Sequence, residues 1–150
     1  MSEANKALIM MIFEEALNGG KLDLIDEYFT EGEGIDDPPP SAWNVRPPEG
    51  EGREAGKQEL RDLRASFPDI HWEVNDQIAE GDMVVNRFTI TGTHTGAPFM
   101  GVPASGKRFE MKGLGIDRVV DGIVRQGWDV ADWHGLLQQL GAAPGGDGDG

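Results

Sequence analysis

The order of two hydrophobic periodicities along the chain is the feature that most constrains its fold. Apolar residues recur at helical spacing as far as Phe67, and from Ile70 to Val130 they alternate in segments separated by turns. Helices followed by consecutive antiparallel strands are typical of an α+β fold, in which the helices cover one face of a curved sheet. A strongly curved sheet capped by helices leaves a concave cavity, which is a natural place for an apolar ligand.

The same patterns predict where the elements lie. The helical spacing indicates three N-terminal helices, over residues 2–17, 21–29 and 53–67. Alternation predicts four strands, over residues 70–79, 83–95, 107–119 and 123–130, and a short closing helix over 132–140. Asp121-Gly122 suits the primed turn of a hairpin between the last two strands.

A chain of 150 residues fits one domain, which we expect over residues 1–141, with the glycine-rich residues 142–150 as a mobile tail. Residues 30–52 form a long loop rich in glycine and proline, and loops of this length are usually functional or disordered. Trp43 lies within it, either covering a pocket or packing on a partner subunit. The chain has no cysteine, which removes disulfides, a thiol nucleophile and thiolate metal ligands.

The formal net charge is −14. A field of this sign repels phosphate backbones and anionic lipid, so neither nucleic acid nor a membrane is an expected partner. No apolar run approaches the roughly 20 residues that span a bilayer. The N-terminal residues lack the basic start and cleavage site of a signal peptide, and we expect a cytoplasmic protein that binds a hydrophobic small molecule.

The inventory of motifs leaves acid–base chemistry as the main possibility. The chain has no dinucleotide-binding glycine motif, no phosphate-binding loop and no nucleophile elbow, and its histidines lack metal-ligand spacing, so no metal and no cofactor are expected. Carboxylates and histidine in an apolar cavity can still move protons. Asp129 and Asp132 stand close together before the closing helix, and His94 ends a long strand.

Each of these three candidates also has a structural interpretation. Asp132 is well placed to be the N-cap of the last helix, Asp129 to be a solvated surface charge, and His94 to bond a loop carbonyl. The sequence alone leaves both interpretations open for all three.

Strand parity suggests which other side chains face the cavity. Val84, Asn86, Phe88 and Ile90 share a face if their strand is regular, and so do Ile70, Trp72, Val74 and Ile78. Gln126 and Trp128 have the parity of Val124 and are expected inside, which would turn Asp129 outward. Asp117 is a further polar candidate. The expected substrate-binding residues are Trp43, Asn86, Phe88, Phe99, Met111, Gln126 and Trp128.

A series of short motifs resembles the SnoaL-like polyketide cyclases, or ester cyclases, of the nuclear-transport-factor-2-like superfamily. The series covers roughly residues 67–141 and comprises Phe67-Pro68-Asp69-Ile70, Ile78-Ala79-Glu80-Gly81-Asp82, Gly92-Thr93-His94-Thr95-Gly96, Met100-Gly101-Val102-Pro103, Asp121-Gly122-Ile123-Val124, Trp128, Asp132 and Leu136-Leu137-Gln138-Gln139-Leu140-Gly141. Each motif is weak alone, and the series is specific.

The resemblance implies a cone-shaped α+β barrel and a homodimer or higher oligomer. It also implies ring closure of a polyketide ester by intramolecular aldol condensation, without cofactor or metal, with an acidic side chain as general acid/base. As aligned on the motifs, the family's key aspartate falls on Asp132 and its histidine on His94. One departure lies in the first long loop, where Asp36 stands in place of an expected histidine.

Two further functions fit the same fold. The pocket could open an epoxide, with Arg87 or Arg125 as the cation, or hydrolyse an ester. The chain could instead be a carrier or sensor without chemistry, since a fold does not fix a function.

Overall fold

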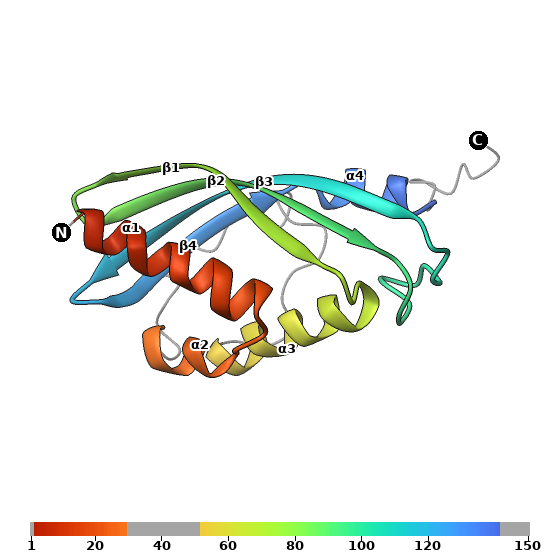
Figure 1. Ribbon diagram of the computed structural model, residues 1–150, viewed down its shortest axis with the longest axis horizontal. Coiled ribbons are helices and arrows are strands. Elements are labelled where there is room, and N and C mark those ends of the chain that lie inside the picture. The colour runs from red at the N-terminus through yellow and green to blue at the C-terminus, as the bar shows by residue number, and fades with distance from the viewer. Residues whose placement is uncertain (1, 30–51, 142–150) are drawn as a thin grey trace.

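A single four-stranded antiparallel sheet organises the computed structural model, which describes residues 2–29 and 52–141 (Figure 1). The helical segments are α1 (Ser2–Met11), the π-helical η1 (Ile12–Asn18), α2 (Asp23–Tyr28), α3 (Gly52–Ser66) and α4 (Trp133–Gln139). The strands are β1 (His71–Glu80), β2 (Met83–Thr93), β3 (Arg108–Val120) and β4 (Ile123–Ala131). The predicted α+β class is confirmed. Trp43, nearly all of the 30–52 loop and the 142–150 tail lie outside the described residues.

The sheet keeps the order of the sequence, β1-β2-β3-β4. Asp121 and Gly122 join β3 to β4 with φ values of 53° and 74°, as the predicted primed turn requires. Figure 1 shows α1, α2 and α3 on one side of the curved sheet, and we call the sheet face toward them the inner face. Val84, Asn86, Phe88 and Ile90 of β2 are all buried there, as their parity predicts.

A one-residue bulge in β4 reverses the parity of the strand. Val124 pairs with Val119 and Gln126 pairs with Arg118, so β4 contains one extra residue, Arg125, relative to the register of β3.

The residues after this bulge point to the faces opposite to those predicted. Gln126 accepts a hydrogen bond from Nε of Arg118 at 2.8 Å on the outer face, and Trp128 shares its parity. Asp129 points inward and lines a cavity. The prediction that Gln126 and Trp128 face inward while Asp129 faces outward is therefore wrong, because it assumes regular alternation and the bulge shifts that alternation by one residue.

A second bulge has the same effect in β1. Val74 pairs with Phe88 and Asp76 pairs with Arg87, which leaves Asn75 as the extra residue. Ile78 is consequently turned outward and is 65% exposed, so the prediction that it shares the face of Trp72 is wrong.

The core between helices and sheet has two parts. One gathers Ile9, Ile12, Ala16, Ile25, Val84, Val119 and Val124, where α1, η1 and α2 cover one end of the sheet. The other gathers Leu63, Phe67, Ile70, Trp72, Phe88, Ile90, Phe99, Phe109, Met111, Trp133, Leu136 and Leu140, where α3 and α4 close the other end. The cavity lies within this second, aromatic part.

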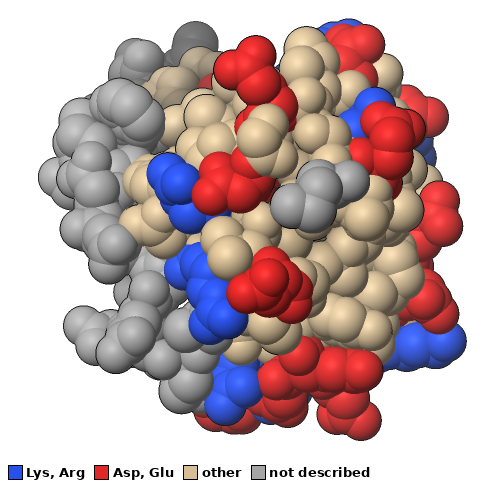
Figure 2. All heavy atoms as spheres, turned by 90° about the vertical axis from the view of Figure 1, so that its left-hand side faces the viewer, with Lys and Arg blue, Asp and Glu red and all other residues tan. Residues whose placement is uncertain are grey.

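Most charged side chains lie on the surface. Figure 2 shows acidic side chains spread over one end of the molecule with basic side chains beside them. Lys57 of α3 is buried, and it forms ion pairs with Asp26 of α2 at 2.8 Å and with Glu54 at 2.9 Å. Among the described residues, no helix is long and apolar enough to cross a membrane.

Candidate functional site

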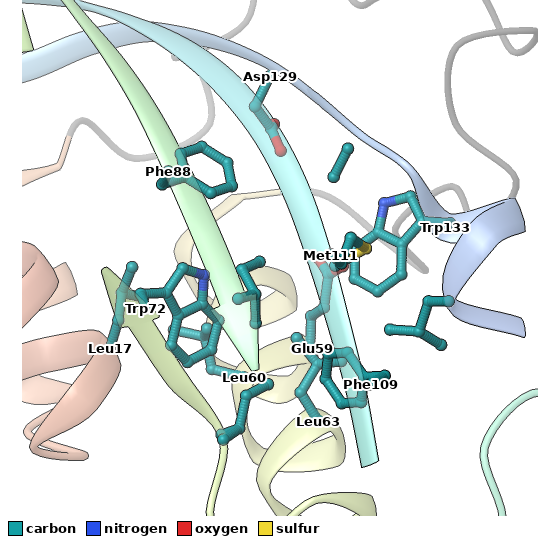
Figure 3. Close-up of a pocket in the computed structure, with 14 residues that line it drawn as sticks. Leu17, Glu59, Leu60, Leu63, Trp72, Phe88, Phe109, Met111, Asp129 and Trp133 are labelled. Atoms are coloured by element: carbon teal, nitrogen blue, oxygen red, sulfur yellow. The ribbon is translucent and has the colours of Figure 1, made fainter. Parts of the chain in front are cut away.

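A cavity of about 150 Å³ opens between the inner face of the sheet, η1, α3 and α4 (Figure 3). Its walls are mostly apolar and include Leu17, Leu60, Leu63, Trp72, Phe88, Ile90, Phe109, Met111, Ala131, Trp133 and Leu136. This volume is below the roughly 300–1,000 Å³ typical of sites for drug-sized ligands. A ligand with several rings would therefore have to displace some of these side chains.

Two acids line this apolar cavity, Asp129 from β4 and Glu59 from α3. Figure 3 shows the carboxyl group of Asp129 directed toward the cavity from the sheet. The residue is exposed to solvent, and its carboxyl group lies on the concave inner face of the sheet, where it lines the cavity. Desolvation of the carboxyl group by the surrounding protein raises the pKa of Asp129 above its ordinary value, which favours proton exchange with a substrate.

Asp117 of β3 neighbours Asp129 on the inner face. Asp117 pairs with Gly127 and Asp129 pairs with Gly115, so the two carboxyl groups lie diagonally across adjacent strands. Burial, followed by the negative charge of Asp129, raises the pKa of Asp117 to about 7. Two carboxyl groups in different surroundings thus lie near each other on the inner face of the sheet.

Asp132 lies outside this region and caps a helix. It is exposed, and its Oδ1 accepts a hydrogen bond at 2.8 Å from the backbone N–H of Gly135 in the first turn of α4. Asp132 is not among the residues that line the cavity.

His94 is fully buried beyond the end of β2, also outside the cavity lining. Its Nε2 donates a hydrogen bond to the carbonyl oxygen of Ala97 at 2.8 Å, and its ring packs 5.1 Å from that of Phe67. The His94 carbonyl oxygen accepts bonds from the N–H groups of Ser105 and Gly106, so this residue ties together the loop between β2 and β3.

The remaining predicted residues divide between the cavity and other places. Phe88 and Met111 line it. Phe99 is buried behind it, stacked on Trp133 with ring centroids 6.1 Å apart. Asn86 is buried on the inner face beside Gly115.

The cations proposed for epoxide opening lie elsewhere. Arg87 is on the outer face, where its Nε donates a hydrogen bond to Asp76 at 2.6 Å, and Arg125 is exposed at the β4 bulge. In the part of the chain that the structure describes, the cavity lining contains no arginine or lysine, and no three histidine or acidic side chains converge to hold a metal ion.

Sequence reasoning missed several cavity residues. Leu17, Glu59 and Trp133 come from three different helices, so no single periodicity connects them. The apolar stripe of Leu60 and Leu63 indicates the buried face of α3, but it gives no sign that the neighbouring Glu59 reaches the same space.

Comparison with known proteins decides the family. The chain matches the model of the SnoaL-like polyketide cyclases over residues 7–140. It belongs to this family. Aklanonic acid methyl ester cyclase DnrD of Streptomyces peucetius is 31% identical over 128 residues, which is 85% of this chain and 84% of that protein. DauD of Streptomyces sp. (strain C5), which bears the same activity name, is 32% identical over 128 residues, covering 85% of this chain and 76% of that protein.

Solved structures agree with this assignment. TsrD from Streptomyces laurentii superposes with a TM-score of 0.78 at 29% identity, covering 95% of this chain and 99% of that one. IdmH from Streptomyces antibioticus gives a TM-score of 0.75 at 33% identity, covering 91% and 98%. The SnoaL-like chain therefore has the family's fold, and its function is of the polyketide or ester cyclase type.

Proposed function

We propose that this protein closes a ring in a polyketide ester by intramolecular aldol reaction, with Asp129 as the general base. The observation that supports this assignment is a carboxyl group of raised pKa that points into an apolar cavity. The names of the cyclase relatives indicate an aromatic polyketide methyl ester as the substrate class.

The chemistry needs only proton transfers and one new bond. Asp129 takes a proton from the carbon next to a carbonyl group, the resulting enolate carbon attacks a second carbonyl carbon, and that carbonyl oxygen receives a proton. The product is an isomer of the substrate. Exclusion of water favours this reaction where hydrogen-bond donors point at the developing enolate oxygen, because their interaction with its negative charge is stronger in an apolar cavity.

Asp129→Asn and Asp132→Asn form a matched pair that tests the assignment. Removing a positioned general base lowers the rate by about 10²–10⁴, so we expect Asp129→Asn to lose that much kcat at an unchanged fold. Asp132→Asn should keep most of its turnover, because asparagine also caps helices. Ring closure of aklanonic acid methyl ester, followed by chromatography, is the measurement.

Each alternative outcome has a clear meaning. Loss of turnover in Asp132→Asn with normal turnover in Asp129→Asn would transfer the catalytic role to Asp132. Tight binding of the ester without conversion by the wild type would instead favour a carrier.

We further propose that two copies associate through the outer face of the sheet. On that face, one row of directly paired residues, with one residue from each strand, is entirely apolar. We call such a row a rung, and this one consists of Ile78, Val85, Ile116 and Trp128. Leu114 on the same face is 43% exposed, and α1, α2 and α3 lie on the other side. An exposed apolar strip of this kind is typical of a subunit interface.

A further inference from the structure

Three polar side chains meet on the inner face around two glycines. Asn86 of β2 pairs with Gly115 of β3, and Gly115 pairs with Asp129 of β4, so these residues form one rung. Asp117 belongs to the next rung, opposite Gly127.

The glycines leave room for these polar groups to approach one another. A Cβ atom on Gly127 would lie 3.0 Å from Oδ1 of Asp117, so that carboxyl group leans over Gly127 toward β4. A Cβ on Gly115 would make ordinary contacts with Asp129 and Phe88 at 3.5–3.7 Å. The space above Gly115 is thus bounded by Asn86 on one side and by Asp129 on the other.

Asn86 carries buried amide atoms beside Gly115 that a polar ligand atom could satisfy. The residue is 1% exposed, and neither Nδ2 nor Oδ1 has a hydrogen-bond partner among the described residues. A buried amide without partners destabilises a fold, so such groups call for a functional explanation.

Electrostatic repulsion between Asp117 and Asp129 favours a state in which only one of the two carboxyl groups is ionised. Asp117 and Asp129 repel each other when both are ionised, and burial adds to this effect for each. The other titratable groups around the inner face are Glu59 of α3, which lines the cavity, and Tyr28 of α2, which packs on the core beside Val84. Lys6 of α1 forms an ion pair with Glu3.

We propose that Asn86, Asp117 and Asp129 form the oxygen-binding end of the site, where Asp117 and Asp129 act as an acid–base pair. This inference rests on the proposed function and adds the group that supplies the second proton. Asp129, as carboxylate, takes the proton from carbon; Asp117, as carboxylic acid, gives its proton to the carbonyl oxygen that is attacked. The amide of Asn86 donates a hydrogen bond to that oxygen. Afterwards the proton on Asp129 passes to Asp117, which restores the starting state.

Carboxyl-carbon NMR titration of the full chain labelled at aspartate tests the pair without any substrate. Asp129→Asn should lower the titration midpoint of Asp117, because it removes the neighbouring negative charge. Asp117→Asn should leave the midpoint of Asp129 almost unchanged, because Asp117 is already protonated and neutral when Asp129 titrates. Asp132→Asn is the control and should change neither. An Asp117 midpoint that stays the same in Asp129→Asn would overturn the pair, whatever the activity assay shows.

Asn86→Leu tests the amide, since leucine has a similar shape and no polar atoms. We expect a higher melting temperature together with a loss of kcat of about 10²-fold, as when an oxyanion donor is removed. Asn86→Asp, which keeps the size but removes the donor, should lose a similar factor. A lower melting temperature of Asn86→Leu with unchanged kcat would show that the amide is structural and would overturn its role. If the Asp117 midpoint falls in Asp129→Asn but wild type closes no ring, the pair stands and the proposed function fails.

Discussion

Asp117 is the residue whose charge state depends most on the fold. Its ordinary pKa is 3.8, and burial together with the charge of Asp129 raises it to about 7. Because the folded pKa lies above the unfolded one, the folded state favours the protonated form. The contribution of Asp117 to the free energy of unfolding is therefore fully present below about pH 4, and it is lost as the pH rises through 7.

Asp117→Asn should remove this pH dependence, because asparagine stays neutral. We expect equal free energies of unfolding for variant and wild type near pH 4, and a variant more stable by on the order of 2 kcal/mol at pH 8. Urea unfolding between pH 4 and 8 measures the difference. A constant difference across this range would mean that Asp117 does not titrate there.

Asp69 shows the opposite electrostatic effect at the end of α3. Burial alone would raise its pKa, but hydrogen bonds from the hydroxyl and backbone N–H of Thr93, each 2.7 Å long, outweigh burial and lower it. The carboxylate therefore ties α3 to β2, and its contribution is lost as the pH falls through its folded pKa. Aspartates in different parts of the fold thus serve structure or chemistry according to the partners that surround them.

At the scale of elements, the contact between α3 and the loop after β2 depends on one glycine. The N–H groups of Gly96 and Ala97 donate hydrogen bonds to the carbonyl oxygens of Ser66 and Ala65, at 3.1 and 2.9 Å. A Cβ atom on Gly96 would lie only 1.8 Å from the Ala65 oxygen. The loop can approach the helix end this closely only because the side chain is absent.

Gly96→Ala should therefore break both hydrogen bonds and destabilise the fold by about 3 kcal/mol. Gly56→Ala is the matched control, since nothing lies within 4 Å of its Cβ in α3 and alanine is favoured in helices. We expect this control to gain about 0.5–1 kcal/mol. Thermal unfolding compares the two; equal effects would show that the close approach is unimportant.

The two bulges explain why part of the site could not be predicted at this scale. Regular alternation from Val124 would place the Asp129 side chain on the outer face. The extra residue Arg125 shifts this alternation by one position, so Asp129 lies on the inner face. A similar reversal at Asn75 brings Ile78 to the outer face. The residues of a bulge carry no distinctive composition here, so only pairing with the neighbouring strand reveals it.

At the scale of the whole molecule, the outer face offers a test of association. Ile78→Lys places a charge in the apolar rung, and we expect it to convert a dimer into a monomer. Glu73→Lys is the control, because this exposed residue lies on the same face of β1 on the other side of the bulge. Light scattering after size-exclusion chromatography measures the mass. A wild type that is monomeric at tens of micromolar would contradict the proposed interface.

The sequence by itself determined the order of helices and strands, the Asp121-Gly122 turn, the inward face of β2 and the family. These features depend on local periodicity, turn chemistry and short motifs, which are all readable along the chain. Tertiary structure alone decided that Asp129 points into the cavity while Asp132 caps α4, and that Asn86, Asp117 and Asp129 lie together. The direction of a side chain after a bulge, and the pKa of a buried acid, depend on neighbouring strands far apart in the sequence, which no local pattern records.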